Sequence, residues 1–250
     1  MANGITEDIE IVLKSLKANH FNPVEFVKDC ATAARLVLDM IPRDAQVGLG
    51  GSTSVRQLGI LEQLRKRGTT IINDAESSEI PFDDLMRRTL RSDVLLASSN
   101  AVTLDGKLVN IDGMGNRVAG MVFGPKKVIL VIGRNKIVRN VDQAIIRLKN
   151  VIAPYHAKAY GARLPCAVTG YCTDCDSPSR ICRITTIIEK KPSVTDVAIL
   201  LVGEDLGLGW DPDWPEEHKE RIASVYLETR KRYFPADRRL PQERRSVSTG

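Results

Sequence analysis

The N-terminal part of the chain has a helical pattern of hydrophobic and polar positions. Apolar residues recur every three or four positions over residues 5–18 and predict an amphipathic helix. A second helix is predicted from about Pro23 to Met40, because Pro23 suits a first turn and Pro42 cannot continue a helix. We therefore expect residues 1–42 to form a helical segment that packs on the core.

Beyond this segment, short apolar runs alternate with helical stretches. Strands are predicted at residues 45–50, 69–73, 93–97, 127–132, 184–189 and 197–202. Helices are predicted at residues 55–64, 82–90, 142–152 and 215–233. The pair Asp105-Gly106 predicts a hairpin that interrupts this rhythm. The alternation indicates an α/β fold, with a mainly parallel sheet flanked by helices, over residues 43–234.

The positive charge of the chain is concentrated at its C-terminal end. The net charge of +5 arises entirely from residues 219–250, which contain nine basic and four acidic residues, and the preceding part is neutral. A neutral body argues against a groove for a polyanion, so we expect no nucleic-acid partner. The basic tail, residues 235–250, is predicted to be disordered.

Targeting and membrane signals are missing from the sequence. No run approaches the roughly eighteen apolar residues that a transmembrane helix needs. The N-terminus has neither a basic region nor an apolar core of the kind found in signal peptides. We therefore expect a cytoplasmic protein without a membrane span.

Four of the five cysteines lie within one short segment, in the pattern Cys166-x5-Cys172-x2-Cys175-x6-Cys182. A Cys-x2-Cys pair on a turn directs two thiolates at one centre, and two flanking thiolates can complete a tetrahedral site or a cubane. Loop-forming residues lie between them, as a chain that wraps around a metal requires. The sequence therefore predicts that Cys166, Cys172, Cys175 and Cys182 bind a 4Fe-4S cluster, with zinc as the alternative. Structural disulfides and a thioredoxin-like pair at Cys172 and Cys175 are weaker interpretations.

A glycine-rich turn follows the first strand of the α/β region. The sequence VGLGGSTS, residues 47–54, ends a strand and opens a helix, an arrangement that directs free backbone N–H groups at an anion. It lacks the lysine of a P-loop and the spacing of a dinucleotide fingerprint. We expect a phosphate or carboxylate to bind here, whereas a tight turn with a Ser or Thr N-cap is the alternative. The candidate binding residues are Gly48, Gly50, Gly51, Ser52 and Thr53, with Ser54 as a further donor.

Polar residues also follow the strand at residues 93–97. Ser98, Ser99 and Asn100 come at its carboxyl end, where ligands of α/β folds usually bind, so they are predicted to face the same ligand. The next turn contains Asp112, Asn116 and Arg117, which suit acid/base work and fixation of a carboxylate or phosphate. Capping of the next helix by Asp112 and Asn116 is the alternative. The predictions are Asp112 and Arg117 as catalytic residues, and Ser99, Asn100 and Asn116 as binding residues.

These motifs resemble those of the lactate-utilisation (LUD) domain family. The resemblance runs from about residue 5 to residue 210 and rests on VGLGGSTSVRQLGI, on the stretch SSNAVTLDGKLVNIDGMGNRVAGMVFGPKKVILVIGRNKIV and on PCAVTGYCTDCDSPSRICR. The cysteine motif marks a subgroup. The resemblance implies a fold similar to ribose-5-phosphate isomerase, glucosamine-6-phosphate deaminase and the CoA transferases. In the isomerase such a loop holds the sugar phosphate, and Gly48 to Thr53 match it here.

Two main hypotheses for function follow. Some members of the family act in an iron–sulfur complex that oxidises lactate, so the resemblance implies a subunit or electron-transfer partner in oxidation of a small 2-hydroxy acid. That hypothesis expects other iron–sulfur or redox subunits as partners. The alternative is a stand-alone lyase, isomerase or hydrolase acting on a small phosphorylated or carboxylated metabolite, with a structural cysteine site. A ligand-sensing module without catalysis is a third possibility, and a homodimer is possible in each case.

Overall fold

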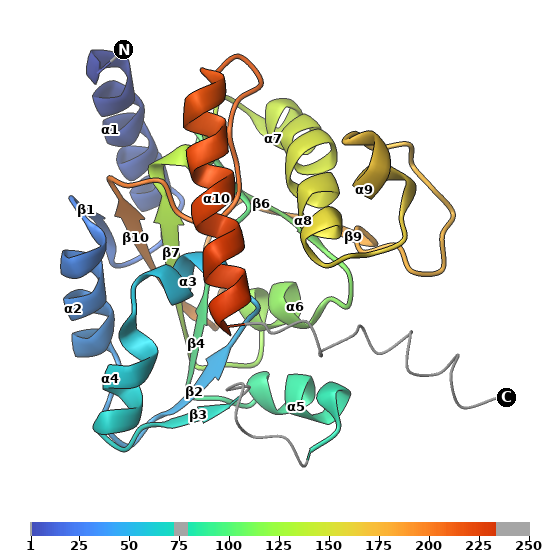
Figure 1. Ribbon diagram of the computed structural model, residues 1–250. Coiled ribbons are helices and arrows are strands. Elements are labelled where there is room, and N and C mark those ends of the chain that lie inside the picture. The colour runs from blue at the N-terminus through green and yellow to red at the C-terminus, as the bar shows by residue number, and fades with distance from the viewer. Residues whose placement is uncertain (1, 73–79, 234–250) are drawn as a thin grey trace, which may run out of the picture.

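A computed structural model describes residues 2–72 and 80–233, of which residues 2–6 are described as backbone only. Its central layer is a six-stranded parallel sheet with the strand order β1-β10-β7-β4-β2-β3 (Figure 1). The mainly parallel sheet predicted from the sequence is therefore confirmed. The strands are Val24–Val27 (β1), Gln46–Leu49 (β2), Thr70–Ile72 (β3), Val94–Ala97 (β4), Lys127–Gly133 (β7) and Asp196–Val202 (β10).

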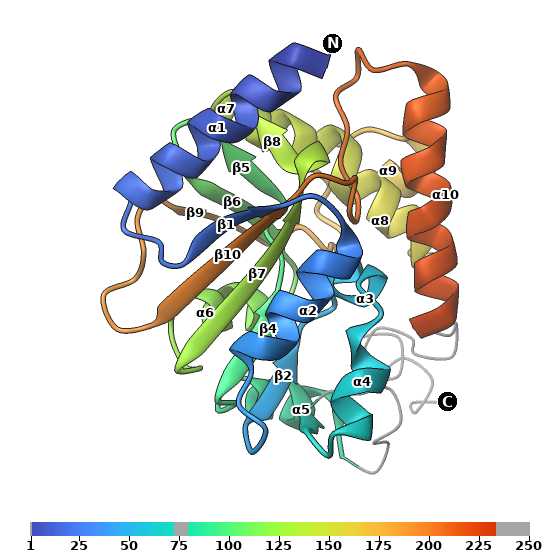
Figure 2. The ribbon, with the colours of Figure 1, turned by 90° about the vertical axis from the view of Figure 1, so that its left-hand side faces the viewer.

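Helices cover both faces of this sheet (Figure 2). On one face, α2 (Cys30–Met40), α3 (Thr53–Gln57) and α4 (Ile60–Lys66) bury apolar side chains against alternate strand residues such as Leu49, Leu96 and Leu200. On the other face, α1 (Ala2–Ala18) and α6 (Asn116–Val122) pack against the intervening residues, among them Leu95 and Leu130. Both faces are buried, which explains why the central strands are continuous apolar runs.

The prediction of a helix from Pro23 is wrong in its first part. Residues Val24–Val27 form β1, which extends the main sheet as a parallel partner of β10. Helix α2 begins only at Cys30, where the Asp29 carboxylate accepts a hydrogen bond from the Thr32 N–H over 2.8 Å. The two valines and the phenylalanine of this short segment favour a strand, and the segment pairs with the open edge of β10. The proposed boundary at residue 42 stays a prediction.

A second sheet of four strands, which the sequence pattern does not predict, packs beside the first. Its strand order is β8-β5-β6-β9. The predicted hairpin at Asp105-Gly106 joins β5 and β6, β9 pairs antiparallel with β6, and β8 pairs parallel with β5. The strands are Ala101–Thr103 (β5), Leu108–Asp112 (β6), Ile137–Val138 (β8) and Ile184–Ile188 (β9). Strand β6 of this sheet ends at Asp112, and Arg117 in the helix that follows contacts the loop after β4.

Helix α5 packs near β2, β3 and α6, whereas the other remaining helices lie towards the second sheet and α3 (Figure 1). The helix predicted at residues 142–152 continues further, as α7, a π-helical turn η2 and α8 in succession. The bounds of the remaining helices and helical turns are Phe82–Thr89 (α5), Arg134–Lys136 (η1, a 3-10 turn), Val141–Arg147 (α7), Leu148–Ile152 (η2), Ala153–Ala159 (α8), Pro165–Thr169 (α9) and Glu216–Tyr233 (α10). None of the helices in the described ranges is both long and apolar enough to cross a membrane. The predicted disordered tail, residues 235–250, lies outside those ranges.

Candidate functional site

The strongest candidate for a ligand site lies at the carboxyl ends of β2 and β4. From β2 the chain passes to β3 on one side, and β4 then returns to the other side of β2, so the strand order reverses between them. Ligands of open α/β sheets bind at such a reversal. The Gly50 N–H donates to the Leu96 carbonyl over 3.3 Å and joins the two strand ends. The polar edge, as we call residues 50–54 and 98–100 with Arg117 and Lys136, therefore brings together segments predicted separately from the sequence.

The glycine-rich turn within this edge is tightly built. Ser52 is the N-cap of α3, and its hydroxyl accepts a hydrogen bond from the Val55 N–H over 3.3 Å. The buried Arg56 donates to the carbonyl of Gly50 over 3.0 Å and also to that of Ser52. Gly51 is exposed and a Cβ at that position would have no atom within 4 Å, so an approaching ligand would meet bare backbone there. Both interpretations of this turn, a capped helix start and an anion site, are thus compatible with its geometry.

Two predicted binding residues in this region have packing roles. A Cβ at Gly48 would lie 2.6 Å from the Ser92 hydroxyl, so close approach of the strand to Ser92 requires glycine there. Thr53 is buried on the first turn of α3. Because α3 has only five residues, its dipole adds less to an anion site than the sequence pattern implied.

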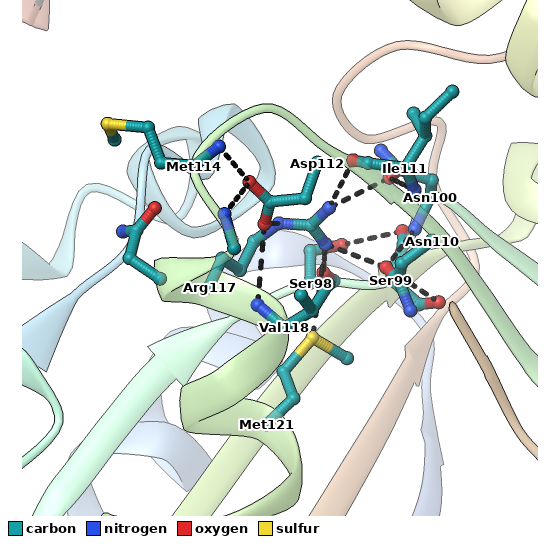
Figure 3. A network of polar contacts seen from close by, with 12 residues as sticks. Ser98, Ser99, Asn100, Asn110, Ile111, Asp112, Met114, Arg117, Val118 and Met121 are labelled. Atoms are coloured by element: carbon teal, nitrogen blue, oxygen red, sulfur yellow. Dashed lines mark hydrogen bonds and ion pairs between the residues drawn. The ribbon is translucent and has the colours of Figure 1, made fainter. Parts of the chain in front are cut away.

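Arg117 connects the loop after β4 to strand β6 (Figure 3). Its Nη1 donates to the Ser98 carbonyl over 3.0 Å and to Asn110 Oδ1 over 2.7 Å. Its Nη2 donates to Asn100 Oδ1 over 2.9 Å and to the Ile111 carbonyl over 2.8 Å. Burial lowers the pKa of Arg117, although a guanidinium stays charged at neutral pH. The two Nη atoms therefore hold protein oxygens, and Arg117 contributes to the polar edge mainly by its charge.

Asp112 acts as a cap for α6. Its Oδ1 accepts hydrogen bonds from the N–H groups of Met114 and Gly115, and its Oδ2 from that of Val118 over 3.3 Å (Figure 3). The same carboxylate lies 3.6 Å from Arg117 Nε. These contacts favour the capping interpretation, while the catalytic role stays an untested prediction.

The other candidates are also engaged by the protein. Ser99 is fully buried and its hydroxyl donates to the Ala101 carbonyl over 2.7 Å. Asn100 accepts from the Ile111 N–H over 3.0 Å in addition to its bond from Arg117. Asn116 is half-buried, and its amide contacts the Met86 sulfur at 3.2 Å. Asn100 is partly exposed at the polar edge and Asn116 is partly exposed on α6, whereas the side chain of Ser99 is fully buried.

Lys136 is the residue that sequence reasoning missed. It follows β7 on the turn η1 and is 4% exposed. Its amine donates to Ser98 Oγ over 2.9 Å, to Ser54 Oγ over 3.0 Å and to the Ser99 carbonyl over 3.0 Å. Burial and then the charge of Arg117 lower the pKa of Lys136 to about 7. The signal available in the sequence was its position just after an apolar strand, the same position that identified Ser98.

In the cysteine segment, residues 166–182, Cys175 packs against a small hydrophobic cluster that contains Cys166. Cys166 is buried on α9, and burial, followed by the thiols of Cys175, Cys182 and Cys172, raises its pKa. Arg180 donates to the carbonyl of Cys175 over 2.9 Å and to that of Cys182 over 3.2 Å. One side chain therefore holds the backbone at two of the four candidate ligands.

The chemistry of this segment fits a thiolate-bound metal group. The N–H of Asp174 contacts the Cys172 sulfur at 3.4 Å, the kind of contact that stabilises a metal-bound thiolate. Within residues 2–72 and 80–233, no three or more His, Cys, Asp or Glu side chains converge on a point that one ion could occupy. A tetrahedral zinc site and a 4Fe-4S cubane both use four thiolates, so the donor types fit either group. Which of the two groups these cysteines bind, a 4Fe-4S cluster or zinc, therefore stays a prediction.

The cysteine segment and the residues just after it contact the turn that begins at Asp112. The Arg183 N–H donates to the Asp112 carbonyl over 2.9 Å, and Ile184 is the register partner of Asp112 in the β6–β9 ladder. A Cβ at Gly113 would lie 2.9 Å from the Ile181 carbonyl. The backbone that leaves the last cysteine therefore packs directly against the turn that precedes Arg117.

The chain was compared with solved structures, curated proteins and family models. One solved structure, described as a DUF162 family protein from Deinococcus radiodurans, is similar with 12% sequence identity and a TM-score of 0.45, over 80% of this chain and 98% of that chain. No curated protein gives a significant match. Residues 9–202 match the LUD domain. Because this match covers well over half of the sequence, the chain belongs to the LUD domain family.

Proposed function

We propose that this chain is an iron–sulfur protein that binds a small 2-hydroxy acid, such as lactate, or its oxidised product at the polar edge. In this role it works as a subunit or electron-transfer partner of other redox proteins. Membership of a family associated with lactate utilisation supports the class of substrate. The iron–sulfur cluster and the ligand site are argued from the chain's own residues.

The observation that carries the proposal is the contact between the cysteine segment and the turn at Asp112. Four neighbouring thiols, three of which raise the pKa of Cys166, form a donor set suited to a 4Fe-4S cluster. Such a cluster, when bound, accepts and passes on single electrons. The hydrogen bond from Arg183 to Asp112 ties this segment to the polar edge. This bond links the residue after the candidate cluster ligand Cys182 to the turn that precedes Arg117.

The charge balance at the polar edge supports a carboxylate ligand. Lys136 is buried there, Arg117 is partly buried, and Asp112 is a carboxylate near Arg117. Exposed backbone at Gly51 and the half-buried amide of Asn100 could orient a carboxylate and a neighbouring hydroxyl. These groups would bind and orient the ligand.

The environment of Lys136 favours a second candidate function. An amine with a pKa of about 7, hydrogen-bonded to two serine hydroxyls, is suited to acid/base chemistry. A stand-alone lyase, isomerase or hydrolase could use it on a small carboxylated or phosphorylated metabolite. In that case the cysteine segment would have a structural role.

Anaerobic purification followed by metal analysis separates these functions. We expect a broad absorption band near ~400 nm that bleaches with dithionite, together with about four irons and four sulfides per chain. A colourless protein with one zinc per chain would contradict the electron-transfer role and leave the second candidate. Turnover of a metabolite that continues unchanged after the metal group is removed would have the same consequence.

A further inference from the structure

Lys136 has a buried amine without a nearby counter-charge among the described residues. Its three hydrogen-bond acceptors are two serine hydroxyls and one carbonyl, all of them neutral. Over the part of the chain that the structure describes, no carboxylate lies within ion-pair distance of its amine. Burial of an ammonium without a negative partner is costly, so the neutral amine is favoured.

The charged groups around Lys136 increase this cost. Arg117, on α6, repels it from across the polar edge. Asp112 lies 3.6 Å from Arg117 Nε and offsets part of the Arg117 charge. Positive charge therefore exceeds negative charge among these groups.

We propose that an anionic ligand bound at the polar edge supplies the missing counter-charge, so that anion binding is coupled to uptake of a proton by Lys136. This inference rests on the proposed ligand site at that edge, and it adds a regulatory property to it. The coupling is reciprocal, because a group that stabilises the bound anion is itself stabilised by that anion. The hydroxyls of Ser54 and Ser98 join Lys136 to both segments of the edge.

The direction of the pH effect follows from this geometry. In the free protein Lys136 titrates near pH 7, and a nearby anion favours its charged form and raises its pKa. Below pH 6 the amine is already charged, so affinity for the anion stays constant. Above pH 7 a proton must be taken up on binding, and affinity falls by up to about tenfold per pH unit.

Sulfate is the appropriate probe, because it carries no proton between pH 6 and 9. We expect its dissociation constant, measured by calorimetry on the full chain, to be constant near pH 6 and to rise at least tenfold by pH 9. At pH 8, titrations in two buffers of different ionisation enthalpy should report uptake of nearly one proton per sulfate. Affinity that is independent of pH, without proton uptake, would overturn the coupling and leave the proposed binding function standing.

Substitutions of Lys136 test whether this residue takes up the proton when sulfate binds. K136R keeps a permanent charge and is expected to bind sulfate with an affinity that no longer changes with pH. K136M is expected to bind weakly at every pH, whereas K126R, at a lysine whose side chain is 85% exposed, should behave as the unmodified protein does. The buffer comparison needs no substitution, so it decides the question even when a variant fails to fold. Absence of sulfate binding throughout would overturn both this inference and the anion site on which it rests.

Discussion

The backbone N–H of Arg183 donates to the carbonyl of Asp112 over 2.9 Å, and this bond joins two regions that lie far apart in the sequence. Arg183 directly follows the last residue of the cysteine segment, while Asp112 caps the helix that carries Arg117. Movement of the cysteine segment on metal binding would therefore reach the polar edge through strand β6. The two candidate sites are best considered as one unit.

Cys175→Ser is predicted to lower both metal content and melting temperature. Thiolate ligands contribute their binding energy to folding, so loss of one ligand costs stability as well as metal. Metal analysis and thermal unfolding of the anaerobic protein provide the measurement. Cys30→Ser is the matched control, because Cys30 lies on α2 outside the segment and should leave the metal content unchanged. Equal metal content and melting temperature in all three proteins would exclude a metal site on this segment.

Arg117→Met is predicted to lower the free energy of unfolding by about 3 kcal/mol, because four oxygen acceptors lose their donors in a buried region. Urea denaturation followed by circular dichroism measures this change. Arg87→Ala, at an exposed ion pair with Asp83, should change stability by less than about 1 kcal/mol. A similarly small effect for Arg117→Met would contradict the clamping role assigned to Arg117.

Lys136 is predicted to make the folded state less stable as the pH falls from about 10 to about 7. Its pKa is about 7 in the folded protein and near 10.5 in an unfolded chain, so the unfolded state binds more protons in this window. The free energy of unfolding should therefore rise with pH across it, by up to about 1.4 kcal/mol per pH unit. In K136M this contribution disappears, while Lys126→Met should retain it. Parallel stability curves for K136M and the unmodified protein would show that Lys136 is charged throughout.

His156 is predicted to lower the free energy of unfolding at acidic pH. Burial, followed by the charges of Arg230 and Arg117, lowers its pKa to about 3, and its ring nitrogen Nδ1 contacts the Tyr226 hydroxyl. An unfolded chain takes up this proton near pH 6.5, so stability due to the neutral ring is lost as the pH falls from about 6.5 towards 3. Urea denaturation at pH 7 and pH 5 should show a smaller loss for His156→Gln than for the control His20→Asn. An equal loss in both variants would place the acid sensitivity elsewhere.

Much of the fold could be predicted from local patterns. The central strands β4, β7 and β10 are apolar runs, and the helix over residues 82–90 and the hairpin at Asp105-Gly106 also lie where the sequence indicates. The edge strand β1 was missed because four residues carry little periodic signal. The second sheet was missed because it depends on the pairing of β6 with β9, more than seventy residues away.

The candidate site was predictable only in part. Gly50 and Ser98 come together as expected, because the carboxyl ends of parallel strands share one edge. The partners of Arg117 could not be predicted, since a sequence does not show whether a guanidinium faces a ligand or the protein's own carbonyls. Lys136 was missed for the same reason, because its burial depends on contacts with distant serines.

The central claim is that a cluster on the cysteine segment and a ligand at the polar edge share one structural unit at Asp112. Electron paramagnetic resonance of the anaerobic, dithionite-reduced protein tests it most directly, with spectra recorded before and after addition of lactate or pyruvate. We predict the signal of a reduced 4Fe-4S cluster, with a line shape that changes on ligand addition. A protein without any cluster signal, or a cluster signal that stays unchanged while calorimetry shows that the ligand binds, would contradict the claim.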